Sequence, residues 1–201
     1  AVRDVLATTD KDVNLLYDLE VHGLRQLLVG RNVFLIPHLQ DNTFRAKLTA
    51  SASDRQALYD FVAAGGVLEI HGSYYADDIL NEVFGWGVSV SYNSWSTSTM
   101  ISGDQKASSI FKSLPDTFNG PFYYWYLLFN VPAGAKSIFR TSRHASYHAV
   151  MVIPVGAGTV RYVALSYTYS VTNPIKYPFE SILKLATSST EALDKTLDKI
   201  G

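Results

Sequence analysis

The chain has 201 residues, enough for one large domain or two small ones, and its 47% hydrophobic content is that of an ordinary globular protein. It contains no cysteine, which excludes disulfides, cysteine nucleophiles and thiolate metal sites. The net charge of −1 is spread without basic blocks, which argues against a nucleic-acid partner, and no apolar run is long enough for a transmembrane segment.

The first half of the chain alternates between strand-like and helix-like patterns. Ser53 with Gln56 predicts a capping box at the start of a helix, and Gly65 and Gly66 predict its end. A continuous apolar run follows each of the first two helical patterns, as expected for strands buried on both faces of a parallel sheet. The predicted strands are residues 2–7, 32–37 and 67–71. The first predicted helix follows Asp12 and ends near Gly30, and the next two are residues 53–64 and 75–84.

The second half has a different pattern, with alternating short strands and a glycine-containing hairpin at residues 155–158. Residues 94–102 read as a polar loop and residues 105–112 as a short helix. We expect an α/β fold with three layers, a doubly wound and mostly parallel sheet of the flavodoxin-like kind, and an antiparallel extension in the C-terminal half. The predicted strands here are 88–92, 122–131, 136–141, 148–154 and 159–166, and further helices are predicted at 179–186 and 191–200.

No linker or internal repeat divides the chain, so we expect one domain over residues 1–201, with residues 190–201 as a peripheral helix.

Three blocks in this order resemble the class I glutamine amidotransferase-like superfamily, and within it the ThuA-like branch and uncharacterised domains of secreted proteins. They are residues 33–37, residues 61–85 with Gly65-Gly66 before the strand, and residues 149–165. The resemblance implies that this chain is a single amidotransferase-like domain. The amidotransferases of this superfamily need a cysteine on the strand-to-helix turn and a late histidine, and this chain lacks both. It therefore implies a scaffold without glutaminase chemistry.

Ligands of doubly wound sheets bind at the carboxyl ends of the parallel strands. In this sequence those ends carry His38, His71, Ser73 and Tyr74, which we take as candidate ligand-binding residues. Ser73 could also serve as a nucleophile, with His144 or His148 as its base and Asp77 or Asp78 as the acid that orients the base. His71 is a further catalytic candidate. The turn lacks the second glycine of a nucleophile elbow, so a role for Ser73 in capping the next helix is the simpler interpretation.

The other candidate polar residues are better explained by structural roles than by metal binding. His144 and His148 are too far apart along a strand to share one ion, and Asp77 with Asp78 fits the first turn of a helix, where acidic side chains are stabilising. We therefore expect no metal and no cofactor. Because Tyr, Trp and short hydroxyl side chains form adhesive surfaces, Trp95 and Trp125 are added to the candidate ligand-binding residues.

From these features the leading hypothesis is a non-catalytic interaction or structural module that binds a protein and self-associates, in an extracellular or cell-surface protein. One alternative is a carbohydrate-binding module, because flat aromatic faces stack on sugar rings. A second alternative is a hydrolase that uses Ser73.

Overall fold

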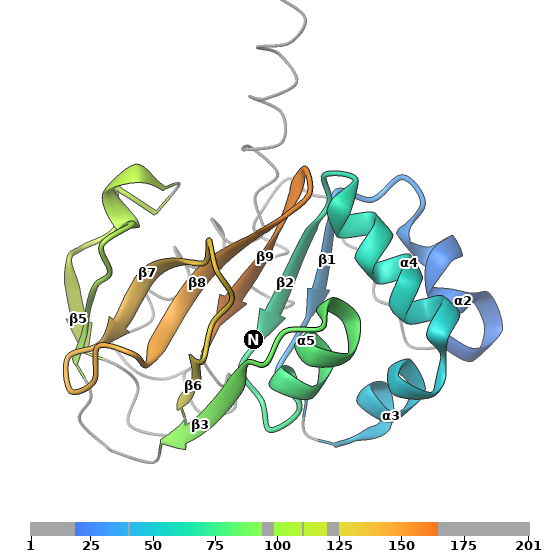
Figure 1. The fold of residues 1–201 in the computed structure, drawn as a ribbon, viewed down its shortest axis with the longest axis horizontal. Helices are drawn as coiled ribbons and strands as arrows, with labels where there is room; N and C mark the ends of the chain where they lie inside the picture. The colour runs from blue at the N-terminus through green and yellow to red at the C-terminus, as the bar shows by residue number, and fades with distance from the viewer. Residues whose placement is uncertain (1–18, 40, 94–98, 110, 120–124, 165–201) are drawn as a thin grey trace, which may run out of the picture.

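The computed structural model describes residues 19–39, 41–93, 99–109, 111–119 and 125–164 of the chain (Figure 1). The strands are β1 (Val33–Ile36), β2 (Val67–His71), β3 (Ser89–Asn93), β4 (Thr99–Ser102), β5 (Thr117–Asn119), β6 (Trp125–Phe129), β7 (Lys136–Thr141), β8 (His148–Val155) and β9 (Gly158–Val163). The helices are α2 (Leu19–Leu28), α3 (Thr43–Ala50), α4 (Ala52–Ala63) and α5 (Ala76–Phe84), with a 3₁₀ turn at Lys106–Ser108.

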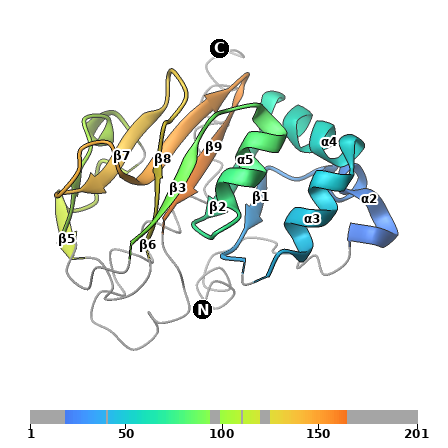
Figure 2. The same cartoon turned by 60° about the horizontal axis from the view of Figure 1, so that its bottom comes forward.

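All of these strands belong to one mixed sheet in the order β1-β2-β9-β8-β7-β4-β5, with β6 joined to β8 and β3 joined to β6. Strands β1, β2 and β9 run parallel, whereas the remaining pairings are antiparallel. Figures 1 and 2 show the helices gathered over the parallel part and the antiparallel strands extending away from it. The predicted α/β flavodoxin-like class with an antiparallel extension is confirmed.

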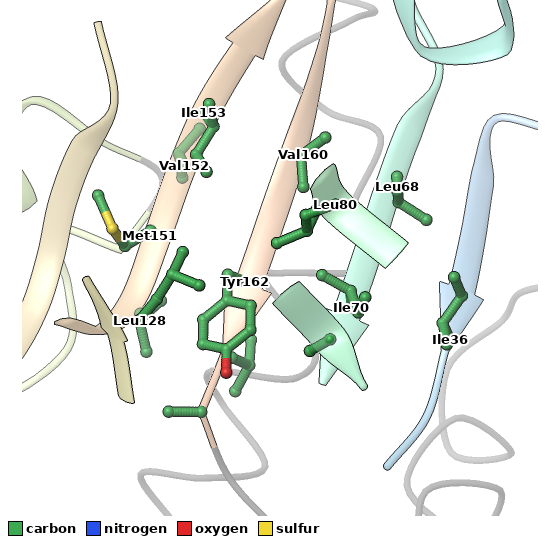
Figure 3. Close-up of a cluster of buried hydrophobic side chains, with 14 of the residues drawn as sticks. Ile36, Leu68, Ile70, Leu80, Leu128, Met151, Val152, Ile153, Val160 and Tyr162 are labelled. Carbon is green, nitrogen blue, oxygen red and sulfur yellow. The ribbon is translucent and has the colours of Figure 1, made fainter. Parts of the chain in front are cut away.

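The hydrophobic core lies between the sheet and the helices. Ile36, Ile70, Tyr162 and Met151 are register partners on neighbouring strands, so their side chains form one row across the sheet (Figure 3). Leu80 of α5 packs in the same buried cluster. Because side chains alternate along a strand, the residues between these core positions point to the opposite face.

Helix α4 begins two residues earlier than the predicted capping box. Ser51 is the N-cap, and its Oγ accepts a hydrogen bond from the Asp54 amide at 3.3 Å. Gln56 instead donates to Asp60 on the exposed side of the helix, at 2.8 Å. The prediction of Ser53 with Gln56 is wrong because a second Ser-x-x-acid spacing, which also satisfies an orphan amide, lies just before it.

Two further expectations needed correction, and three lie outside the described residues. Residues 99–102, predicted as part of a polar loop, form β4, because both neighbouring strands supply backbone partners. The predicted helix at 105–112 is reduced to the 3₁₀ turn, and α3 was not predicted. The strand expected at 2–7 and the helices expected at 179–186 and 191–200 fall outside the described residues. None of the helices in the described part is long and apolar enough to span a membrane.

The side chain of Asn81 ties α5 to the start of β3. Its amide nitrogen donates to the Val88 carbonyl at 2.9 Å, and its oxygen accepts from the Val88 amide at 3.0 Å. Asn81→Ala leaves both backbone groups without these partners, so we expect a loss of about 1–3 kcal/mol in the free energy of unfolding. Urea unfolding followed by circular dichroism measures it. Asn81→Asp keeps the acceptor only and should fall between the wild type and Asn81→Ala.

Candidate functional site at the strand ends

Parallel pairing brings the carboxyl ends of β1, β2 and β9 to one edge of the sheet, and β6 reaches the same edge. Gly72, directly after β2, donates its amide to the Val163 carbonyl at 2.8 Å. Ala164 directly follows Val163 in the chain, and its carbonyl accepts a hydrogen bond from the Tyr126 amide of β6 at 3.0 Å. These backbone bonds carry β6, and with it the Tyr126 side chain, onto the strand ends.

Gly72 is required at this position by the close approach of β6. A Cβ at residue 72 would lie 2.7 Å from the Tyr126 Cβ and 2.8 Å from the Ala164 carbonyl oxygen. No side chain fits there without displacing backbone. The glycine of the Gly72-Ser73-Tyr74 turn is thus explained by packing against Tyr126.

His38 follows β1 and lies half-buried beside this turn. Its Nδ1 is 2.6 Å from the Gly72 carbonyl oxygen. A carbonyl oxygen only accepts, so Nδ1 carries the hydrogen and, in the neutral ring, Nε2 carries a lone pair. Within the described residues no hydrogen bond to this Nε2 is formed, so it can accept one from a ligand.

Four rings form a contact group at the strand ends, which we call the aromatic cluster: His38, Tyr74, Tyr92 and Tyr126. Tyr126 is 4% exposed and lies 5.3 Å from His38, 5.0 Å from Tyr74 and 5.4 Å from Tyr92, measured between ring centroids. Tyr74 and Tyr92 are 59% and 39% exposed, and their rings are 5.4 Å apart. A buried tyrosine therefore supports two exposed tyrosine rings.

The carboxylate of Asp77, in the first turn of α5, connects this helix to β3. Its two oxygens accept backbone amides from Val90 at 3.0 Å and Asp78 at 3.1 Å, which joins α5 to β3. Burial raises the pKa of Asp77 above its ordinary value, although these amides act in the opposite direction. Burial, followed by the nearby Asp77 charge, also raises the pKa of Tyr162, whose hydroxyl donates to the Tyr126 carbonyl. Both groups hold the structure together rather than facing a ligand.

Ser73 is 1% exposed. Its Oγ accepts a hydrogen bond from the Tyr75 amide at 3.3 Å. The Ser73 hydroxyl thus helps to form the turn before α5, and among the described residues no imidazole hydrogen-bonds to it.

His71 does not join the aromatic cluster. It is fully buried, and its Nε2 hydrogen-bonds to Oε1 of Glu69, which is also fully buried. Arg161, 1% exposed, is the register partner of Glu69 on β9, so its side chain lies on the same face of the sheet. Sequence reasoning missed this group. The signal was the presence of charged residues inside two otherwise apolar strands, each of which must bury its polar atoms with partners.

The remaining predicted residues lie elsewhere. His148 is on β8, where its Nδ1 is 2.9 Å from the Ser137 Oγ. His144 is exposed in the connection between β7 and β8, and its ring contacts Tyr147. Trp95 lies outside the described residues, and Trp125 is placed only by its backbone in β6. Among the described residues no group of three His, Asp or Glu side chains could hold a metal ion.

Comparison with known proteins gives a fold. No protein-family model matches the chain, and no curated protein matches it. Among solved structures, the cytoplasmic protein STM1381 from Salmonella typhimurium LT2 superimposes with a TM-score of 0.66 at 14% identity, over 93% of this chain and 86% of that one. A putative ThuA-like protein from Bacteroides uniformis gives 0.64 at 14% identity, over 92% and 79%. The chain has a ThuA-like fold. At this level of identity the likeness extends to the ThuA-like architecture and no further.

One comparison corrects the sequence analysis. STM1381 and a second similar structure, STM3548 from Salmonella typhimurium, with a TM-score of 0.63 at 10% identity over 92% of this chain and 83% of that one, are both named cytoplasmic proteins. This contradicts the expected extracellular or cell-surface location. The expectation rested on low charge and many tyrosines, and burial accounts for part of that composition, as with Tyr126 and Tyr162.

Proposed function

We propose that this protein is a non-catalytic ligand-binding domain, and that its ligand is a carbohydrate bound on the aromatic cluster. The observation that carries the proposal is the pair of exposed rings, Tyr74 and Tyr92, supported by buried Tyr126 next to an imidazole whose Nε2 is an acceptor. Tyrosine rings supply a flat apolar face and a hydroxyl at low entropic cost. His38 in its neutral form would accept a hydrogen bond from a sugar hydroxyl.

The ligand class follows from the chemistry of the four rings. None of them carries a fixed charge, which favours a neutral ligand over an anion or a cation. The three tyrosine centroids are only 5.0–5.4 Å apart, so the rings fill the space between them and leave no cage for a cation. A neutral ring with hydroxyl groups fits both the apolar faces and the acceptor.

The absence of catalysis is proposed on two grounds. We infer that the scaffold is that of the class I glutamine amidotransferase-like superfamily, whose amidotransferases use a cysteine that this sequence lacks. The hydroxyl that replaces it in the Gly72-Ser73-Tyr74 turn is buried and accepts a backbone amide. Incubating the protein with nitrophenyl esters and glutamine tests this proposal, and hydrolysis that Ser73→Ala abolishes would overturn it.

Removing the most exposed ring provides the test of the ligand site. A glycan array should give binding by the wild type, and Tyr74→Ala should weaken the strongest interaction about tenfold, which corresponds to about 1.4 kcal/mol. Because Tyr74 is an exposed side chain, its removal should leave the unfolding transition nearly unchanged. Tyr59→Ala is the matched control, since Tyr59 is also exposed but lies on α4. An array without any bound glycan, or equal effects of the two variants, would contradict the proposal.

A second candidate function, contact with a protein, is favoured by a different surface. Phe84 and Trp86 stack with centroids 4.6 Å apart and an interplanar angle of 17°, and Tyr59 lies 6.0 Å from Phe84. We propose this group as the contact if the domain self-associates. Light scattering over a range of concentrations tests it. Tyr59→Ala should then weaken the dimer, whereas Tyr74→Ala should not.

A further inference from the structure

The β7–β8 hairpin differs in charge from the rest of the chain. No aspartate or glutamate occurs between Asp116 and Glu180. In the same interval β7 and the connection to β8 carry Lys136, Arg140 and Arg143. The hairpin therefore brings its own positive charge and no negative charge to balance it.

Two basic side chains of this hairpin are direct neighbours. Arg140 of β7 and His148 of β8 are register partners in an antiparallel pair, so their side chains lie on the same face. The Ser137 Oγ lies 2.9 Å from His148 Nδ1. This is the hydrogen bond that the structure gives the side chains of Ser137 and His148. The half-buried Arg140 side chain forms no hydrogen bond or ion pair with any described residue. Protonation of His148 would place two like charges directly opposite each other, which is destabilising. No carboxylate of the described residues forms an ion pair with either side chain.

The neighbouring strands supply no carboxylate to this pair. The carboxylate closest in the chain to the β7 contacts is that of the exposed Asp104, between Gly103 and Gln105, whose amides donate to Ile138 and Ser137. Leu128 of β6 is the other register partner of His148. On the side of β4 and β5, the Asp116 carboxylate bonds Lys106 Nζ at 2.8 Å and the Ser102 hydroxyl at 3.0 Å. Lys106 and Ser102 hold the pKa of Asp116 below its ordinary value, as expected for an engaged carboxylate.

The state of His148 reflects this environment. Burial, and secondly the Arg140 charge, lower the pKa of His148 below its ordinary value. The other titratable groups nearest in the hairpin are the exposed Lys136, Arg143 and His144, all of them basic, and the Tyr147 phenol. These effects favour the uncharged imidazole, and a negative charge at this place would favour its protonation.

We propose that Arg140, Ser137 and His148 form a binding site for a small oxyanion, a phosphate or a carboxylate group. The guanidinium offers two parallel donors to such a group. A protonated imidazole donates its Nδ1 hydrogen to the Ser137 Oγ, which leaves the Ser137 hydroxyl hydrogen as a third donor and adds positive charge beside the anion. This site is on β7 and β8 and is separate from the aromatic cluster, so it does not depend on the proposed sugar site.

The experiment follows the imidazole of His148 by two-dimensional ¹H–¹⁵N NMR during pH titration in sodium chloride, inorganic phosphate and sodium acetate of equal ionic strength. We expect phosphate or acetate to raise the pKa of His148 relative to chloride. The anion that causes the larger shift shows whether the site prefers a phosphate or a carboxylate group. The same pKa in all three salts would overturn the proposal.

Variants of the arginines show whether the response belongs to this site. Arg140→Gln should weaken anion binding about tenfold or more, because a charged hydrogen bond is lost. Arg140→Lys should weaken anion binding less. Arg143→Gln removes the same charge from the exposed connection and should leave the response intact. Equal losses in Arg140→Gln and Arg143→Gln would show general screening and contradict the site. The unfolding curve of each variant establishes that it is folded.

Discussion

Gly158→Ala is expected to destabilise the protein by about 3 kcal/mol or more, because the new methyl group has no room. A Cβ at residue 158 would lie 2.1 Å from the Val62 carbonyl oxygen and 2.3 Å from the Gly66 carbonyl oxygen. Both contacts are with backbone, at the point where the β8–β9 hairpin packs on the end of α4, so no side-chain rotation relieves them. Urea unfolding with circular dichroism measures the loss.

Gly87→Ala is the matched control for this prediction. A Cβ at residue 87 meets no atom within 4 Å, and its backbone is not in the left-handed region. We expect a change of no more than about 1 kcal/mol, and a small gain is consistent with a more restricted unfolded chain. If both alanine variants unfolded at the same urea concentration as the wild type, this result would contradict the close packing of the hairpin against α4.

Glu69→Ala is expected to cost about 3–5 kcal/mol, the loss found when one partner of a buried ionisable pair is removed. The variant removes the hydrogen-bond partner of His71 Nε2, and His71 is fully buried. Glu82→Ala provides the comparison, because Glu82 lies 3.9 Å from Arg55 on the exposed side of α5 and its pair should contribute at most about 1 kcal/mol.

A double variant separates the pair from simple loss of volume. Glu69→Leu with His71→Leu replaces both polar groups by apolar ones, so it should cost less than the sum of the two single leucine variants. Strictly additive losses would mean that the two side chains do not depend on each other.

Strands β1 and β2 were predictable because, apart from Glu69 and His71, their residues are apolar, as expected for strands covered on both faces. The hairpin at residues 155–158 was predictable from its glycines, and Gly156 has a φ of 57°. By contrast, β4 was missed because Thr99–Ser102 has no strong apolar pattern, and its extended form depends on partners from β5 and β7. The start of α4 was missed because two serines compete for the N-cap.

The candidate site could be predicted only in part. His38, Ser73 and Tyr74 were identified from their place after parallel strands, a rule of topology that needs no contacts. Tyr92 and Tyr126 were not identified as members of the site, because β3 and β6 reach the strand ends through long-range pairing. The buried position of Ser73 and the bonding of His71 to Glu69 likewise depend on packing that local sequence does not determine.

The most direct test of the account is to map the strongest glycan from the array onto the protein by NMR. We predict chemical-shift changes at the His38 imidazole and at the rings of Tyr74 and Tyr92, with hydrogen bonding at the Nε2 of His38. Changes confined to Tyr59, Phe84 and Trp86 would place the binding surface on the helices and contradict a ligand site at the carboxyl ends of the parallel strands.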